Sequence, residues 1–142
     1  HDFACARKAI EETARRGIRV GAHIILGLPG EDAKESLRQA PIISSLPLTT
    51  LKIHQLQIIR GTRLAKMYAE KPFHLYTVEE YIKLIADYIS LLRPDLVLER
   101  FVSQSPPDLL IAPKWGLKNY EFTHRLHNFI KEKLNNNAQS DK

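Results

Sequence analysis

Hydrophobic positions along the chain follow two spacings. Apolar residues three or four positions apart predict amphipathic helices, and apolar residues at every second position predict strands. The spacing predicts helices over residues 2–16, 32–46, 78–92 and 120–134, with a short helix after Gly61. It predicts strands over residues 18–26, 51–59 and 96–102, while 109–112 is too short to assign.

The order of these predicted elements indicates an α/β fold. Asp32 with Glu35, and Thr77 with Glu80, have the spacing of a capping box, which marks a helix start. Regular alternation of strands with helices predicts right-handed crossovers and a parallel sheet. A three-stranded parallel sheet leaves two unpaired edges, so we expect it to belong to a larger sheet or barrel.

Composition and charge narrow the class of protein. The chain has 142 residues, of which 44% are hydrophobic and 26% charged, as in one folded domain of ordinary size. Its net charge of +5 is spread over helix-like segments, which favours a solvated surface but leaves a phosphate or nucleic-acid partner open. We divide the chain into a domain over residues 1–134 and a flexible polar tail over 135–142.

No apolar stretch approaches the roughly 18 residues of a membrane span, and no signal-peptide pattern is present. We therefore expect no membrane partner and a cytoplasmic location. Because His1 is not Met, we expect the sequence to start at an excision point within a longer protein.

The chain has one cysteine, Cys5, so it cannot form an internal disulfide or supply an iron–sulfur cluster by itself. We expect no metal ligands in this chain and interpret Cys5 as a packing residue rather than a nucleophile.

Ligands in α/β folds bind beyond the carboxyl ends of the strands, which singles out two turns. One is Gly27–Gly30, which could let a ligand approach the backbone or could be a plain tight turn. The other contains Arg60, an anion-binding candidate or a loop charge, and Thr62, a candidate N-cap.

A third candidate site lies on one face of the predicted sheet. By the two-residue period of a strand, His23 shares a face with Ile25, and Lys52 shares one with His54. Together with Arg100 they could bind substrate or transfer protons, or could form a structural hydrogen-bonded network. Trp115 is interpreted as a plug at one end of the core, with ligand stacking as the alternative.

These residues carry a family resemblance. The run from Gly17 to Glu31, with its Gly27-Leu28-Pro29-Gly30-Glu31 turn, resembles the fifth-strand motif of radical S-adenosylmethionine (radical SAM) enzymes. The likeness is greatest to an uncharacterised bacterial iron–sulfur oxidoreductase-like subfamily, similar to the Elongator catalytic subunit and oxygen-independent coproporphyrinogen oxidase. Further matching runs are residues 1–5, 51–54, 61–65 and 110–115, so the resemblance extends in the right order over almost the whole chain up to the tail.

The resemblance implies a fold and a set of site residues. The fold would be the C-terminal portion of a partial (β/α)6 TIM-like barrel, with parallel strands alternating with helices. The cofactor-binding residues would be Ile25, Gly27, Leu56 and Gln57, all near the adenosine of S-adenosylmethionine. The substrate-lining residues would be His23, Lys52, His54 and Arg100, while the catalytic residues stay unknown.

The resemblance also implies chemistry for the intact protein. That protein would hold S-adenosylmethionine and a [4Fe–4S] cluster, the latter on a three-cysteine loop in an N-terminal half that is missing here. It would cleave S-adenosylmethionine to a 5′-deoxyadenosyl radical, which abstracts hydrogen from an unknown substrate. We expect the chain alone to hold neither cofactor and to be inactive.

Partners and alternative functions follow from the same features. The expected partners are the missing N-terminal half, a second copy joined through the exposed half-barrel edges, and an unknown substrate for which RNA is one candidate. The alternative function is a non-catalytic α/β module that binds a phosphate, a nucleotide or RNA, because of the Gly27–Gly30 turn and the positive charge.

Overall fold

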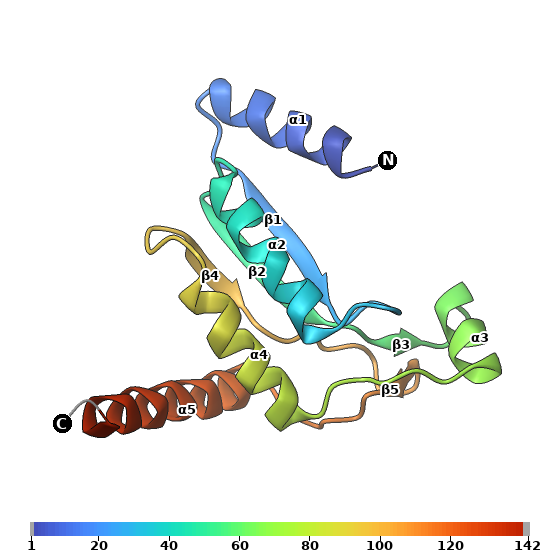
Figure 1. The fold of residues 1–142 in the computed structure, drawn as a ribbon. Helices are drawn as coiled ribbons and strands as arrows, with labels where there is room; N and C mark the ends of the chain where they lie inside the picture. Colours follow the sequence, from blue (N-terminus) through green and yellow to red (C-terminus); the bar gives the residue numbers. More distant parts are fainter. Residues whose placement is uncertain (1, 141–142) are drawn as a thin grey trace.

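The computed structural model describes residues 2–140 as a small parallel sheet with helices packed on one face (Figure 1). Strands β1 (Gly21–Leu26), β2 (Thr50–Gln55) and β4 (Val97–Arg100) pair in parallel in the order β1-β2-β4. Helices α2 (Ala33–Ser45) and α4 (Val78–Ser90) lie on the same side of this sheet. The predicted parallel sheet alternating with helices is confirmed.

The core fills the space between that sheet and its two helices. Leu26, Leu51 and Ile53 project from the strands and are fully buried, as are Tyr81 and Ile85 of α4. An aromatic group closes the end of the core, and its members are Tyr81, Phe101, Trp115 and Phe122. These contacts bury one face of the sheet, as a helix-covered parallel sheet requires.

Helix starts follow the capping signals closely. The Thr77 side chain accepts from the Glu80 N–H while the Glu80 carboxylate accepts from the Thr77 N–H, a complete capping box. At α2, Asp32 accepts from the Glu35 N–H at 2.7 Å. The predicted capping box is only half formed here, because the Glu35 carboxylate forms an ion pair with Arg38 at 2.5 Å.

Two strand predictions need correction. The first strand begins at Gly21 rather than at residue 18, and Ile18, outside the strand, is 56% exposed. The predicted strand over 51–59 is two strands, because the chain leaves the parallel sheet after Gln55. Strand β3 (Ile58–Ile59) pairs antiparallel with β5 (Leu110–Ala112), a segment too short to assign from sequence. This second sheet and α3 (Arg63–Glu70) extend beyond the parallel sheet (Figure 1).

The two terminal helices differ in how they pack. Helix α1 (Phe3–Arg15) has no fully buried residue, whereas α5 (Asn119–Ser140) buries Phe122 and Leu126 beside α4. Helix α5 continues past its predicted end at Leu134, through most of the segment that we expected to be a tail. Flexibility of residues 135–142 stays a prediction. His1 and the last two residues of that tail lie outside the described residues. Within residues 2–140, no helix is both long and apolar enough to cross a membrane.

Candidate functional site

The face of the sheet opposite the helices carries the histidines and the lysine predicted from sequence. In the register of β1 with β2, His23 lies beside Lys52 and Ile25 lies beside His54. The rings of His23 and His54 are in contact, with centroids 5.3 Å apart. His23 and Ile25 are exposed, and Lys52 and His54 are half-buried. The structure therefore brings these residues together on an uncovered face; their roles toward substrate stay predictions.

Strand β4 adds two charges to this polar face. Arg100 is in register with Lys52, and Lys52 Nζ forms an ion pair with the Glu99 carboxylate at 3.1 Å. A shift in register between Leu51 and Lys52 interrupts the simple alternation, so the two-residue period did not identify Glu99. The polar face thus combines four basic groups with one carboxylate.

His54 is the group best suited to transfer or accept a proton here. Burial lowers the pKa of His54 below its ordinary value of 6.5, and the neighbouring charges of His23, Arg100 and Lys52 lower it further. Its Nδ1 is hydrogen-bonded to Ser103 Oγ. A lowered pKa keeps the imidazole neutral at pH 7, with Nδ1 held by Ser103. Among residues 2–140, no three His, Cys, Asp or Glu side chains are grouped to hold a metal ion.

The Gly27–Gly30 turn is shaped by contacts within the chain. Gly27 is buried with φ of +86°, and a Cβ there would lie 2.9 Å from Cε2 of Tyr76. Glycine at this position is explained by the Tyr76 ring, without reference to a ligand. Gly30 also has a positive φ, of +83°, but faces open space.

Glu31 fastens this turn to helix α2. Its carboxylate accepts hydrogen bonds from the Leu28 N–H at 3.2 Å, from Ser36 Oγ at 2.6 Å and from Gln39 Nε2 at 2.9 Å. The acidic residue after the glycine turn is therefore a positioning residue, which holds the carboxyl end of β1 in place.

Beyond the carboxyl end of β2 lies a network of amides and hydroxyls. Gln55, only 6% exposed, donates to the Ser103 carbonyl at 3.2 Å and accepts from the Ser103 N–H at 2.8 Å. Gln57 donates to the same carbonyl at 3.3 Å and accepts from Ser105 Oγ at 2.7 Å. The backbone N–H of Leu56 donates to the Leu26 carbonyl at 3.1 Å, so this N–H is already used within the chain.

Three further predicted positions have structural contacts. Thr62 caps α3 by accepting from the Ala65 N–H at 3.1 Å, as predicted. Arg60 Nε donates to the Asp108 carbonyl at 3.3 Å, which ties the β3 loop to the loop before β5. Trp115 packs on the aromatic group and donates to the Tyr76 carbonyl at 3.2 Å, and it also lines a cavity beside the Gln55 network.

Comparison with known proteins places this geometry in a family. Residues 48–132 match the Radical_SAM C-terminal domain. The solved structure of Methanocaldococcus infernus Elp3 with an N-terminal deletion superposes with a TM-score of 0.81 at 20% identity, over 94% of this chain and 31% of that one. That likeness concerns the fold.

Curated relatives extend the match over nearly the whole chain. Uncharacterized protein MJ0486 of Methanocaldococcus jannaschii is 32% identical over 94% of this chain and 42% of its own length. Uncharacterized protein YtqA of Bacillus subtilis is 31% identical over 85% of this chain and 38% of its own. The chain thus spans about two-fifths of the length of these relatives. It belongs to the Radical_SAM C-terminal domain family, as the sequence motifs predicted.

Proposed function

We propose that this chain is the C-terminal part of the barrel of a radical SAM enzyme, an iron–sulfur oxidoreductase-like protein. It contributes part of the adenosine site and a substrate-facing wall. The observation that supports this most strongly is the sheet face shared by Ile25, His23, Lys52 and His54, which no helix of the described chain covers. In the intact protein the cofactor supplies radical chemistry, and these residues bind and orient.

The carboxyl end of β1 fits the adenosine part of S-adenosylmethionine. Ile25 is 47% exposed, an unusual position for a large aliphatic side chain on a sheet, and it offers a flat apolar contact to adenine. Gln57 and the carbonyl of Leu56 follow on the neighbouring strand and could hydrogen-bond the adenine edge. Gly27 lets the Tyr76 ring pack against the turn, and a contact of Gly27 with the nucleoside stays a prediction.

The residues of this chain do not fit the cluster. A [4Fe–4S] cluster held by three thiolates needs three cysteines, and this sequence has one, Cys5, which is exposed on α1. We propose that the part of the relatives' length that this chain does not span supplies the cluster ligands and the remaining strands.

The polar face is proposed to receive the substrate. His54, kept neutral by its lowered pKa, can accept or donate a hydrogen bond, and Lys52 and Arg100 can neutralise a negatively charged substrate group. The pair between Lys52 and Glu99 holds the lysine against the sheet.

Binding of S-adenosylmethionine to the longer polypeptide that carries this chain tests the proposal. Ile25→Glu places a carboxylate where adenine is proposed to pack, and we expect it to raise the Kd by about tenfold or more. Ile25→Val, which keeps an apolar contact, should stay within about threefold of the wild type. Equilibrium dialysis with labelled S-adenosylmethionine measures both values.

Ile18→Glu is the matched control, because Ile18 is 56% exposed and precedes the amino end of the same strand. It should bind as the wild type does. Equal weakening by Ile18→Glu and Ile25→Glu, in variants with the wild-type circular dichroism spectrum, would show that the adenosine is not at the carboxyl end of β1.

A further inference from the structure

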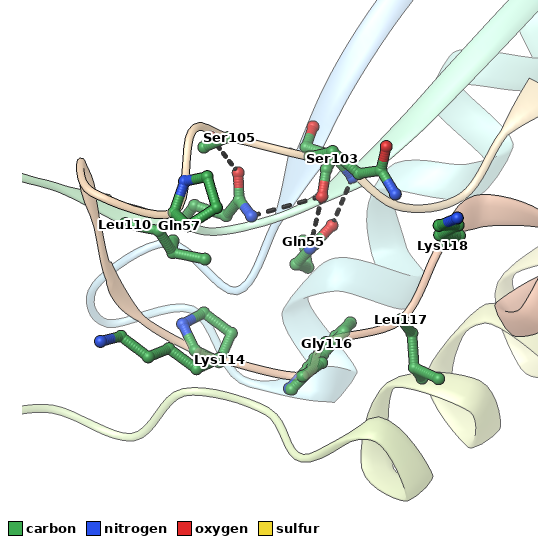
Figure 2. A pocket seen from close by; sticks show the side chains of 13 residues that line it. Gln55, Gln57, Ser103, Ser105, Leu110, Lys114, Gly116, Leu117 and Lys118 are labelled. Atoms are coloured by element: carbon green, nitrogen blue, oxygen red, sulfur yellow. Dashed lines mark hydrogen bonds between the residues drawn. The ribbon is translucent and has the colours of Figure 1, made fainter.

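A cavity of about 520 Å³ lies between the carboxyl end of β2 and the segment over residues 103–118. Figure 2 shows residues 114–118 running opposite the Gln55, Gln57 and Ser103 side chains, with the cavity between them. Its volume is within the range of sites that enclose a small organic molecule. Only Gln57, among the residues proposed for adenosine, lines it.

One wall of the cavity is a preorganised polar surface. Gln55 and Gln57 both donate to the Ser103 carbonyl, and Ser105 Oγ donates to Gln57. Each side-chain NH₂ has two hydrogens and these bonds use one of them, so donor capacity remains on both amides. Because the network fixes the amides, a ligand would not have to order them on binding.

The opposite wall is apolar and partly aromatic. Trp115 is held by its hydrogen bond to the Tyr76 carbonyl and by its contact with the Tyr81 ring, at a centroid distance of 5.3 Å. Pro107, Leu110 and Pro113 add further apolar surface to the lining of the cavity. Such a wall favours a flat ring rather than a fully polar ligand.

The charges that line the cavity have a single sign. Lys114 and Lys118 line it and no aspartate or glutamate does. Within the described chain, neither ammonium group is in an ion pair. The nearby Glu121 carboxylate accepts from the backbone N–H of Lys118 at 2.8 Å and lies outside the lining. Two uncompensated lysines favour an anion.

We propose that this cavity binds an organic anion, a phosphate or carboxylate group attached to a flat ring. The ring lies against Trp115, its polar edge meets Gln55, and the anionic group pairs with Lys114 and Lys118. S-adenosylmethionine carries a net positive charge, so this cavity discriminates against it. This site goes beyond the function proposed above, which uses Lys52 and Arg100 for the substrate, and it does not rest on that function.

The single tryptophan makes the cavity directly observable. Because Trp115 is the only tryptophan of the chain, its fluorescence reports on this site alone. The 142-residue chain is titrated with AMP, a ring that carries phosphate, and with nicotinate, a ring that carries carboxylate. Adenosine, inorganic phosphate and S-adenosylmethionine are titrated in parallel. We expect saturable binding of AMP, of nicotinate or of both, and the stronger of the two identifies the anionic group.

Lysine variants test the charge contribution. Lys114→Gln with Lys118→Gln should weaken binding of the ring-bearing anion by about tenfold. Lys131→Gln, an exposed lysine of α5 that does not line the cavity, is the matched control and should bind as the wild type does. All three lysines are exposed, so the variants should keep the wild-type thermal unfolding midpoint.

Several results would overturn the proposal. One is the lack of a saturable fluorescence change with AMP and with nicotinate up to about 10 mM. Others are adenosine, inorganic phosphate or S-adenosylmethionine binding as tightly as the ring-bearing anion, or an unchanged Kd in the double lysine variant. Because the titration uses no cluster and no radical reaction, its failure is separate from failure of S-adenosylmethionine to bind the longer protein.

Discussion

Replacing Gly27 with alanine tests whether the turn after β1 is shaped by Tyr76. The substitution has two costs. Alanine at φ of +86° must adopt the left-handed region, which costs about 1–2 kcal/mol. The new Cβ would also lie 2.9 Å from Cε2 and 3.1 Å from Cδ2 of the Tyr76 ring, an overpacking that costs about 1–3 kcal/mol. We therefore expect Gly27→Ala to lower the free energy of unfolding by about 3 kcal/mol.

Gly30→Ala separates the two costs. Gly30 has a nearly equal φ of +83° but no atom within 4 Å of an added Cβ, so only the backbone cost applies. We expect a loss of about 1 kcal/mol, because alanine also restricts the unfolded chain. Replacing Tyr76 with leucine should remove much of the extra cost, so that Gly27→Ala in that background resembles Gly30→Ala.

Urea unfolding followed by circular dichroism measures these free energies. Equal losses for Gly27→Ala and Gly30→Ala, with Tyr76 intact, would refute the argument. That result would mean that the Tyr76 ring moves aside freely, and a ligand would then be the better explanation for glycine at position 27.

The other predictions concern titration, packing and association. The folded-state pKa of His54 lies below 6.5, so NMR titration should give a midpoint below 6.5, and protonation of His54 should lower the free energy of unfolding as pH falls below 6.5. Lys52→Gln should raise this midpoint but leave it below 6.5, because burial lowers the His54 pKa more than the Lys52 charge does. A midpoint at or above 6.5 would contradict the geometry. Phe122→Ala should cost about 3–5 kcal/mol in urea unfolding because Phe122 is fully buried. Lys133→Ala, which breaks a partly exposed 2.6 Å pair with Asp87, should cost at most about 1 kcal/mol. Similar losses for the two variants would contradict this packing. The chain alone should self-associate through the unpaired edge of β1, and a strictly monomeric particle in sedimentation across micromolar concentrations would count against it.

Local signals in the sequence predicted the elements that depend on local contacts. The capping box at Thr77 and Glu80 and the cap at Thr62 are satisfied within three residues, so spacing alone identified them. The face shared by His23 and Lys52 followed from strand periodicity, because β1 pairs with β2 without a break in register.

Features made by distant segments could not be predicted in the same way. Ile58 and Ile59 continue the apolar pattern of β2, and their separate pairing depends on β5, about fifty residues further along the chain. The network between Gln55 and Ser103 likewise joins residues 48 positions apart. The sequence did not indicate the role of Glu31 either, because its carboxylate accepts hydrogen bonds from Leu28 and Ser36 within the chain.

Release of 5′-deoxyadenosine from S-adenosylmethionine tests the central claim most directly. The longer polypeptide that carries this chain would be reconstituted anaerobically with iron and sulfide, reduced with dithionite, and its products separated by chromatography. We predict that 5′-deoxyadenosine is formed, and that Ile25→Glu lowers its rate by about tenfold or more at limiting S-adenosylmethionine while Ile18→Glu does not. No 5′-deoxyadenosine from protein with a full cluster, or an unchanged rate in Ile25→Glu, would contradict the account.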